Sequence, residues 1–114
     1  MLGITTETRV FLKTGFIDGR LGIEGLRGLV SKVLNADVRS GLFAFCNRRA
    51  NRIKLLWYHE GGFYVAAKRM DHGSIDWPRD EAGAARMSAT QLETLLKGVE
   101  FRRHQRPNAP RYRR

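Results

Sequence analysis

The sequence predicts an α+β domain: an antiparallel sheet of about four to five strands, with a helix after the first strand and a short C-terminal helix, in the order β-α-β-β-β-α. Three features predict it: alternating β-forming segments, an apolar stretch at helical spacing, and a capping box near residue 90. With 114 residues, of which 42% are hydrophobic, the chain can bury one modest core. We expect a single domain over residues 1–100 and a basic, disordered tail over 101–114.

The first strand is expected at Arg9–Lys13, where apolar and polar residues alternate. A helix over about 20–35 follows, because Ile23, Leu26 and Val30 recur at helical spacing, and Asp18 is its expected N-cap. Glycines recur every third residue from Gly19 to Gly28, but the Gly-Lys-Ser/Thr ending of a phosphate-binding P-loop is absent. We therefore expect these glycines to let the helix lie close to the sheet.

The middle of the chain predicts three strands. Gly41–Cys46 is apolar throughout, which indicates burial on both faces, and a polar, basic turn follows it. Strands over 52–58 and 63–70 then flank the turn sequence His59-Glu-Gly-Gly62. If Tyr58 lies opposite Tyr64, one face of this hairpin is apolar, with Ile53, Leu55, Trp57, Phe63, Val65 and Ala67.

The C-terminal part predicts less structure. Ser74–Trp77 is expected to add an edge strand that Pro78 ends, and residues 79–86 are expected to form a linker. Ser88-Ala-Thr-Gln91 is a capping box that opens a short helix, which Gly98 is expected to close.

Positive charge dominates the composition. The chain has 21 Lys and Arg against 11 Asp and Glu, a formal net charge of +10. Residues 38–59 contain five cations and no acid, and residues 101–114 contain six arginines and no acid. Such a field attracts polyanions, and arginine suits phosphate better than lysine does.

These segments predict a nucleic-acid-binding surface rather than an enzyme. Tyr58 and Tyr64 could stack on bases, although aromatic residues on a sheet are more often cross-strand packing partners. The expected phosphate contacts are Arg48, Arg49, Arg52, Lys54, Lys68, Arg69, Arg102 and Arg103.

No pattern predicts catalysis or a cofactor. His59, His72 and His104 lack ligand spacing, and Cys46 is the only cysteine, so neither a zinc site nor a disulfide is expected. The acids near Asp76 could serve a magnesium-dependent nuclease, but solvated turn residues explain them better. Without an apolar run or a signal peptide, we expect a cytoplasmic bacterial protein that does not associate with membranes and is able to associate with the nucleoid.

Several motifs in order resemble a known family. They are Asp18-x-Arg20-x-Gly22-x-Glu24-Gly25-Leu26, Asn47-Arg48-Arg49, Ile53-Lys54-Leu55-Leu56-Trp57-Tyr58, Gly62-Phe63, Lys68-Arg69, Trp77-Pro78 and Leu95-Leu96-x-Gly98-Val99. Together they are similar to the small TnpB-type, second-frame accessory protein of bacterial insertion sequence 66 transposons, over about residues 9–107. One departure is Leu21, where that family usually has a basic residue.

The resemblance implies a role in DNA transposition beside a separate catalytic transposase and a further accessory protein, with DNA at the transposon ends as the expected ligand. RNA-guided nucleases that share the TnpB name are much longer, and their activity is not implied. An alternative is a protein–protein interaction module that docks its basic surface on the transposase. Charge and motifs leave open whether the polymer is duplex DNA, single-stranded DNA or RNA.

Overall fold

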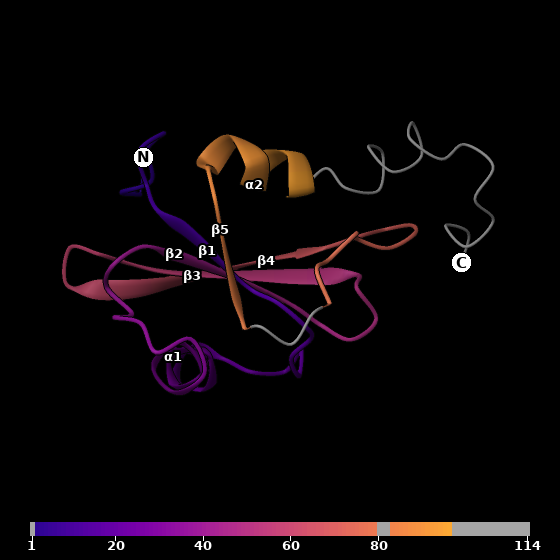
Figure 1. The fold of residues 1–114 in the computed structure, drawn as a ribbon, viewed down its shortest axis with the longest axis horizontal. Helices are drawn as coiled ribbons and strands as arrows, with labels where there is room; N and C mark the ends of the chain where they lie inside the picture. The colour runs from indigo at the N-terminus through magenta and orange to yellow at the C-terminus, as the bar shows by residue number, and fades with distance from the viewer. Residues whose placement is uncertain (1, 80–82, 97–114) are drawn as a thin grey trace.

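The computed structural model describes residues 2–79 and 83–96, and its α+β class agrees with the prediction. Figure 1 shows helix α1 on one side of a five-stranded sheet and helix α2 on the other. In chain order the elements are β1 (Val10–Lys13), α1 (Ile23–Lys32), β2 (Leu42–Cys46), β3 (Arg52–His59), β4 (Gly62–Arg69), β5 (Ala84–Met87) and α2 (Ala89–Leu96).

The sheet is mixed, with the strand order β4-β3-β2-β1-β5. Strand β1 pairs parallel with β2, Val10 opposite Leu42, and every other pairing is antiparallel. The expectation of a purely antiparallel sheet is therefore wrong at this one pairing. Helix α1 carries the chain back to the end of the sheet where β1 began, so the next strand runs in the same direction.

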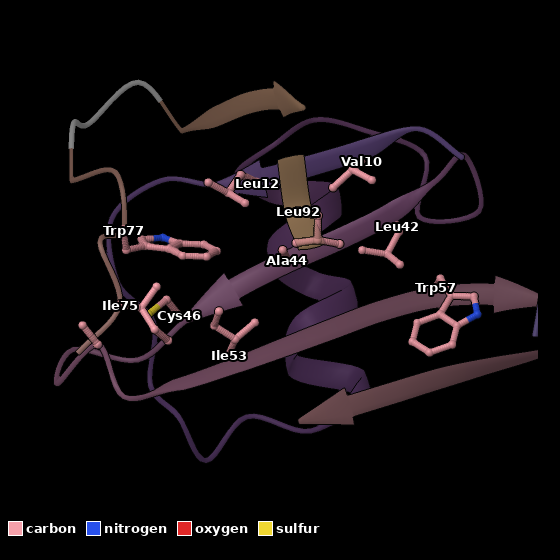
Figure 2. Packing of buried hydrophobic residues seen from close by; sticks show 11 residues of the cluster. Val10, Leu12, Leu42, Ala44, Cys46, Ile53, Trp57, Ile75, Trp77 and Leu92 are labelled. Atoms are coloured by element: carbon pink, nitrogen blue, oxygen red, sulfur yellow. The ribbon is translucent and has the colours of Figure 1, made fainter. Parts of the chain in front are cut away.

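Strand β2 is buried on both faces, as its apolar run predicts. On one face, Leu92 of α2 joins Ile53, Trp57 and Trp77 in a cluster drawn in Figure 2. On the other face, α1 packs against the sheet, in a cluster of Ile17, Leu26, Val30, Phe43, Phe45 and Leu56. The domain therefore has two apolar layers, one on each side of a single sheet.

The last strand differs from the prediction. Ser74–Trp77 is not a strand; Ile75 and Trp77 are buried in the core, and the Trp77 indole Nε1 donates a 3.0 Å hydrogen bond to the Lys13 carbonyl. Strand β5 forms instead at the end of the expected linker and includes Met87 beyond it, with Arg86 opposite Phe11. Its Ala-Ala-Arg-Met sequence has little β preference, so the open edge of β1 selects the extended conformation.

The two helices begin in different ways. The capping box of α2 is confirmed: the Gln91 amide donates to Ser88 Oγ (3.0 Å), and the Ser88 amide donates to Gln91 Oε1 (2.8 Å). The predicted closure of this helix at Gly98 lies outside the described residues. Helix α1 begins after Gly22, which caps without a side chain, so Asp18 is not its N-cap.

The glycines of α1 do not hold it against the sheet. A Cβ added at Gly22 or Gly28 would meet no atom within 4 Å, and one added at Gly25 would meet the side chain of Leu21, four residues earlier in the chain, and not the sheet. The expectation of close glycine packing is therefore wrong. Helix α1 contacts the sheet through its large buried side chains, Leu26 and Val30.

The hairpin register is one residue away from the expected one. Tyr64 pairs with Trp57, and Tyr58 pairs with Phe63, because a two-residue turn at Glu60 (φ 48°) and Gly61 (φ 89°) closes the hairpin. Two consecutive positive φ values define the type I′ turn that matches strand twist. Phe63 and Val65 therefore lie on the α1 face of the sheet.

The observed register places a lysine on the apolar face of the hairpin. Lys68 does share a face with Ile53, its partner across the strands, but its amine reaches out to donate a 2.8 Å hydrogen bond to the Leu96 carbonyl at the end of α2. Its aliphatic stem can cover apolar surface while the charge binds a helix terminus.

The register can be tested by cross-linking. With Cys46 replaced by Ala, Lys54→Cys combined with Ala67→Cys should form a disulfide readily, because these residues are directly opposite in a pair without mutual hydrogen bonds. Lys54→Cys with Lys68→Cys is the matched control and should stay reduced. Mass spectrometry of the oxidised proteins gives the result, and preferential linkage of the control pair would support the other register.

Candidate nucleic-acid interface

An open depression of about 760 Å³ lies at one end of the sheet. The segment after β1, the loop between β2 and β3, and the end of β4 form its walls. The residues that line it are Phe16, Ile17, Asp18, Gly19, Arg20, Asn47, Arg48, Arg49, Asn51, Arg52 and Arg69. We call it the arginine depression, since five of these side chains are guanidinium groups.

The loop that carries Arg48 and Arg49 is built around Asn47. The Asn47 side-chain oxygen accepts hydrogen bonds from the backbone amides of Asn51 (3.1 Å) and Arg52 (2.9 Å), and its amide nitrogen donates to Asn51 Oδ1 (2.8 Å). Ala50 takes a positive φ of 57° and is buried. With its backbone fixed in this way, the loop exposes both arginines at its tip.

The segment after β1, which forms the neighbouring wall of the depression, lies close to this loop. Ile17 bridges to Asn47, and the Ile17 amide donates a 2.8 Å hydrogen bond to the Cys46 carbonyl. A Cβ at Gly19 would come within 3.1 Å of the Asn47 Cβ, which is tighter than most such contacts. Glycine at position 19 therefore lets the two walls approach one another.

Two arginines face each other across the hairpin. Arg52 at the start of β3 is directly opposite Arg69 at the end of β4, on the same face of the sheet. Within residues 2–79 and 83–96, no carboxylate forms an ion pair with either of them, or with Arg48 or Arg49. Like charges directly opposite on a sheet destabilise the pair.

Arg20 also lines the arginine depression, although it is not among the eight phosphate contacts predicted from the sequence. Its guanidinium donates two hydrogen bonds to the Asp18 carboxylate, at 3.0 and 2.8 Å, and its backbone amide donates a third at 2.9 Å. These hydrogen bonds lower the pKa of Asp18 to about 2. Arg20 has no basic residue near it in the sequence, so clustering of cations along the chain could not identify it.

The two lysines of the predicted set lie outside the depression. The Lys54 amine donates a 2.7 Å hydrogen bond to the Leu21 carbonyl just before α1, and the Lys68 amine is bound to the end of α2 on the opposite face. Each therefore has a structural contact with a helix end. Of the eight predicted phosphate contacts, the structure brings together Arg48, Arg49, Arg52 and Arg69, and Arg102 and Arg103 lie outside the described residues.

The two candidate stacking tyrosines lie on opposite faces of the sheet, as a consequence of the register. Tyr64 stacks on Trp57 with ring centroids 5.1 Å apart and is 40% exposed. Tyr58 packs edge-on against Phe63 and lies under the Arg39 guanidinium, 4.9 Å from its ring centroid. Both side chains thus make cross-strand aromatic contacts, and neither lines the depression.

The described residues contain no cluster of three or more His, Cys, Asp or Glu side chains that could hold a metal ion. Cys46 lies in the core, and burial raises the pKa of its thiol to about 12. None of the helices placed by the structure is both long and apolar enough to span a bilayer.

The ionisation of Asp18 provides a test of the Asp18–Arg20 contact. Because its pKa is lowered from 3.8 to about 2, this contact stabilises the fold above pH 3.8 and is lost as the pH falls through about 2. A carboxyl NMR titration should show a midpoint near 2, which Arg20→Ala returns toward 3.8. Arg27→Ala, which removes a partner of Glu24 instead, should leave it unchanged; a midpoint insensitive to Arg20→Ala would contradict the contact.

Comparison with known proteins identifies the family. The chain is 36% identical over 106 residues to an uncharacterised protein, y4hO, of Sinorhizobium fredii, with 92% of each chain covered. It is also 29% identical over 107 residues to a second uncharacterised protein of that organism, y4jC, covering 93% of this chain and 92% of the relative. No solved structure gives a significant match. The family described as "IS66 Orf2 like protein" matches residues 8–106, and the chain belongs to that family of insertion sequence 66 proteins.

Proposed function

We propose that this protein is a non-catalytic accessory factor of DNA transposition that binds nucleic acid, preferably DNA, through the arginine depression. The observation that carries the proposal is the convergence of Arg48, Arg49, Arg52 and Arg69 on one depression without a carboxylate paired to any of them within the described residues. Family membership supports the proposal, because an insertion sequence is a DNA element and its accessory proteins would act beside that DNA.

Arginine forks bind phosphate in a bidentate manner, and several on one surface can follow a nucleic-acid backbone. Contacts of this kind position a protein without reading the sequence. We propose that a separate transposase, together with a further accessory protein, supplies selection of the transposon ends. In the bacterial cytoplasm the protein would act where the nucleoid is accessible.

The predicted division of the chain into a domain and a basic tail extends this proposal beyond the arginine depression. Residues 1–100 would form the domain, and the basic tail over 101–114 would add contacts through Arg102 and Arg103. Disordered basic segments commonly bind along a backbone or in a groove. Removing residues 101–114 should then weaken binding and leave the fold intact.

The first test is duplex binding by fluorescence anisotropy across a salt series. Arg48→Ala with Arg49→Ala should weaken binding about tenfold and reduce the magnitude of the log–log salt slope by about 2, because each phosphate contact contributes about 0.9. Arg27→Ala with Arg86→Ala is the control of equal charge loss, since neither residue lines the depression. Equal losses in both double variants would show that only net charge matters.

Duplex binding, measured together with capture of the transposase, separates DNA binding from docking on the transposase. Replacing Arg48 and Arg49 by Glu should abolish duplex binding and leave capture of the purified transposase unchanged. The reverse pattern, with duplex binding retained and capture lost, would support the interaction-module alternative.

Because Arg52 and Arg69 face each other, we predict that a change at Arg69 that raises the stability of the fold lowers the affinity for duplex DNA. Arg69→Glu should raise the free energy of unfolding by about 0.5–1 kcal/mol at low salt, because it replaces a like-charge pair with an opposite-charge pair. The same change should weaken duplex binding. Arg69→Gln is the control that removes the repulsion without adding an attraction. Denaturant unfolding measures the stability, and a destabilised Arg69→Glu variant would contradict the prediction.

A further inference from the structure

Strand β4 forms one edge of the sheet, and the described residues place no strand beyond it. All of its eight residues except Phe63 are exposed, and Tyr64 and Val65 are among the most exposed large hydrophobic side chains. The opposite edge, β5, has only four residues. A long exposed edge strand offers a row of backbone donors and acceptors to another strand.

The hairpin register shows which backbone groups point outward. Gly62 closes the two-residue turn opposite His59, and the Met70 amide donates a 2.8 Å hydrogen bond to the Asn51 carbonyl. Because hydrogen-bonded positions alternate in an antiparallel pair, the even-numbered residues of β4 bond to β3. The outward N–H and C=O groups are therefore those of the odd-numbered residues: Phe63, Val65, Ala67 and Arg69.

Two features that usually protect an edge, a β-bulge and a proline, are missing from β4. Its pairing with β3 runs without a bulge from Gly62 to Arg69, and the strand contains no proline. Lys68, the cation best placed to keep another strand away, is bound to the Leu96 carbonyl instead. The outward edge between Phe63 and Ala67 is therefore uncharged.

We propose that β4 pairs antiparallel with β4 of a second copy of this chain, about a two-fold axis at Ala66. This register is the one that uses every outward group: Phe63 of each copy exchanges hydrogen bonds with Arg69 of the other, and Val65 does so with Ala67. On the axis, Ala66 faces Ala66 in a pair with Cα atoms about 4.5 Å apart, where a small side chain is required.

The local charges of β4 do not oppose a second copy in this register. Antiparallel pairing about Ala66 sets Arg69 opposite the uncharged Phe63, and Lys68 opposite Tyr64, so no cation faces a cation. The two Arg69 residues are six positions apart along the strand direction, about 20 Å. The two arginine depressions would lie on the same face of a continuous ten-stranded sheet. The pairing itself does not depend on the proposed binding of nucleic acid.

The oligomeric state is tested on the full-length chain by light scattering across a dilution series. The unmodified protein should be a dimer that dissociates on dilution, and Ala67→Pro should be a monomer, because proline removes an outward N–H that β3 does not use. Ala67→Val is the matched control; it keeps the N–H and should remain a dimer. A monomer at every concentration, or a dimeric Ala67→Pro variant with native circular dichroism, would overturn the proposal.

Cross-linking tests the register independently, and decides the question if Ala67→Pro fails to fold. With Cys46 replaced by Ala, Ala66→Cys should form a disulfide-linked dimer on mild oxidation, since Cα atoms about 4.5 Å apart suit a disulfide. Tyr64→Cys, equally exposed on the same face but opposite Lys68, should link far more slowly. Equal rates for the two variants would overturn the register, and so would linkage of Tyr64→Cys alone.

Discussion

The parallel pairing of β1 with β2 determines where the chemistry of this protein lies. Because the two strands run in the same direction, the segment after Lys13 and the loop after Cys46 leave the sheet at the same end. The hairpin reaches the same end of the sheet, since β3 starts there with Arg52 and β4 ends there with Arg69. Three segments that are separate in sequence therefore meet, and β2, which is buried on both faces, supports them.

Basic residues divide into two groups with different physical roles. Lys54 and Lys68 place long apolar stems along the sheet and donate their amines to carbonyls near helix ends, which suits a flexible side chain with a compact charge. The arginines of the depression have no such backbone partner among the described contacts, except that Arg20 is held by Asp18. Net charge alone does not reveal this division, because both groups count equally toward +10.

Local patterns predicted the elements that local interactions determine. The apolar run of β2, the burial of Ile53 and Trp57, and the capping box at Ser88 all followed from residues close together in the chain. Features that depend on distant partners did not follow. The edge of β1 makes Ala84–Met87 a strand. The register is different, because it is set locally by a type I′ turn with Glu60 at positive φ, a conformation that a non-glycine residue seldom adopts and that the pattern did not predict. That register also decided that the tyrosines lie on opposite faces and that Arg52 meets Arg69.

The position of β5 has a consequence for the order in which the chain can fold. Strands β3 and β4 are joined by two residues and can pair as soon as both exist, whereas β1 gains its outer neighbour only when Met87 pairs with Val10. Bringing Val10 and Met87 together closes a loop that contains most of the domain, which is slow compared with forming a hairpin. During synthesis, β1 must therefore wait beside β2 with its outer edge open until almost the whole domain has left the ribosome. Until then the outer edge of β1 is open to pairing with other chains, and the addition of β5 covers it.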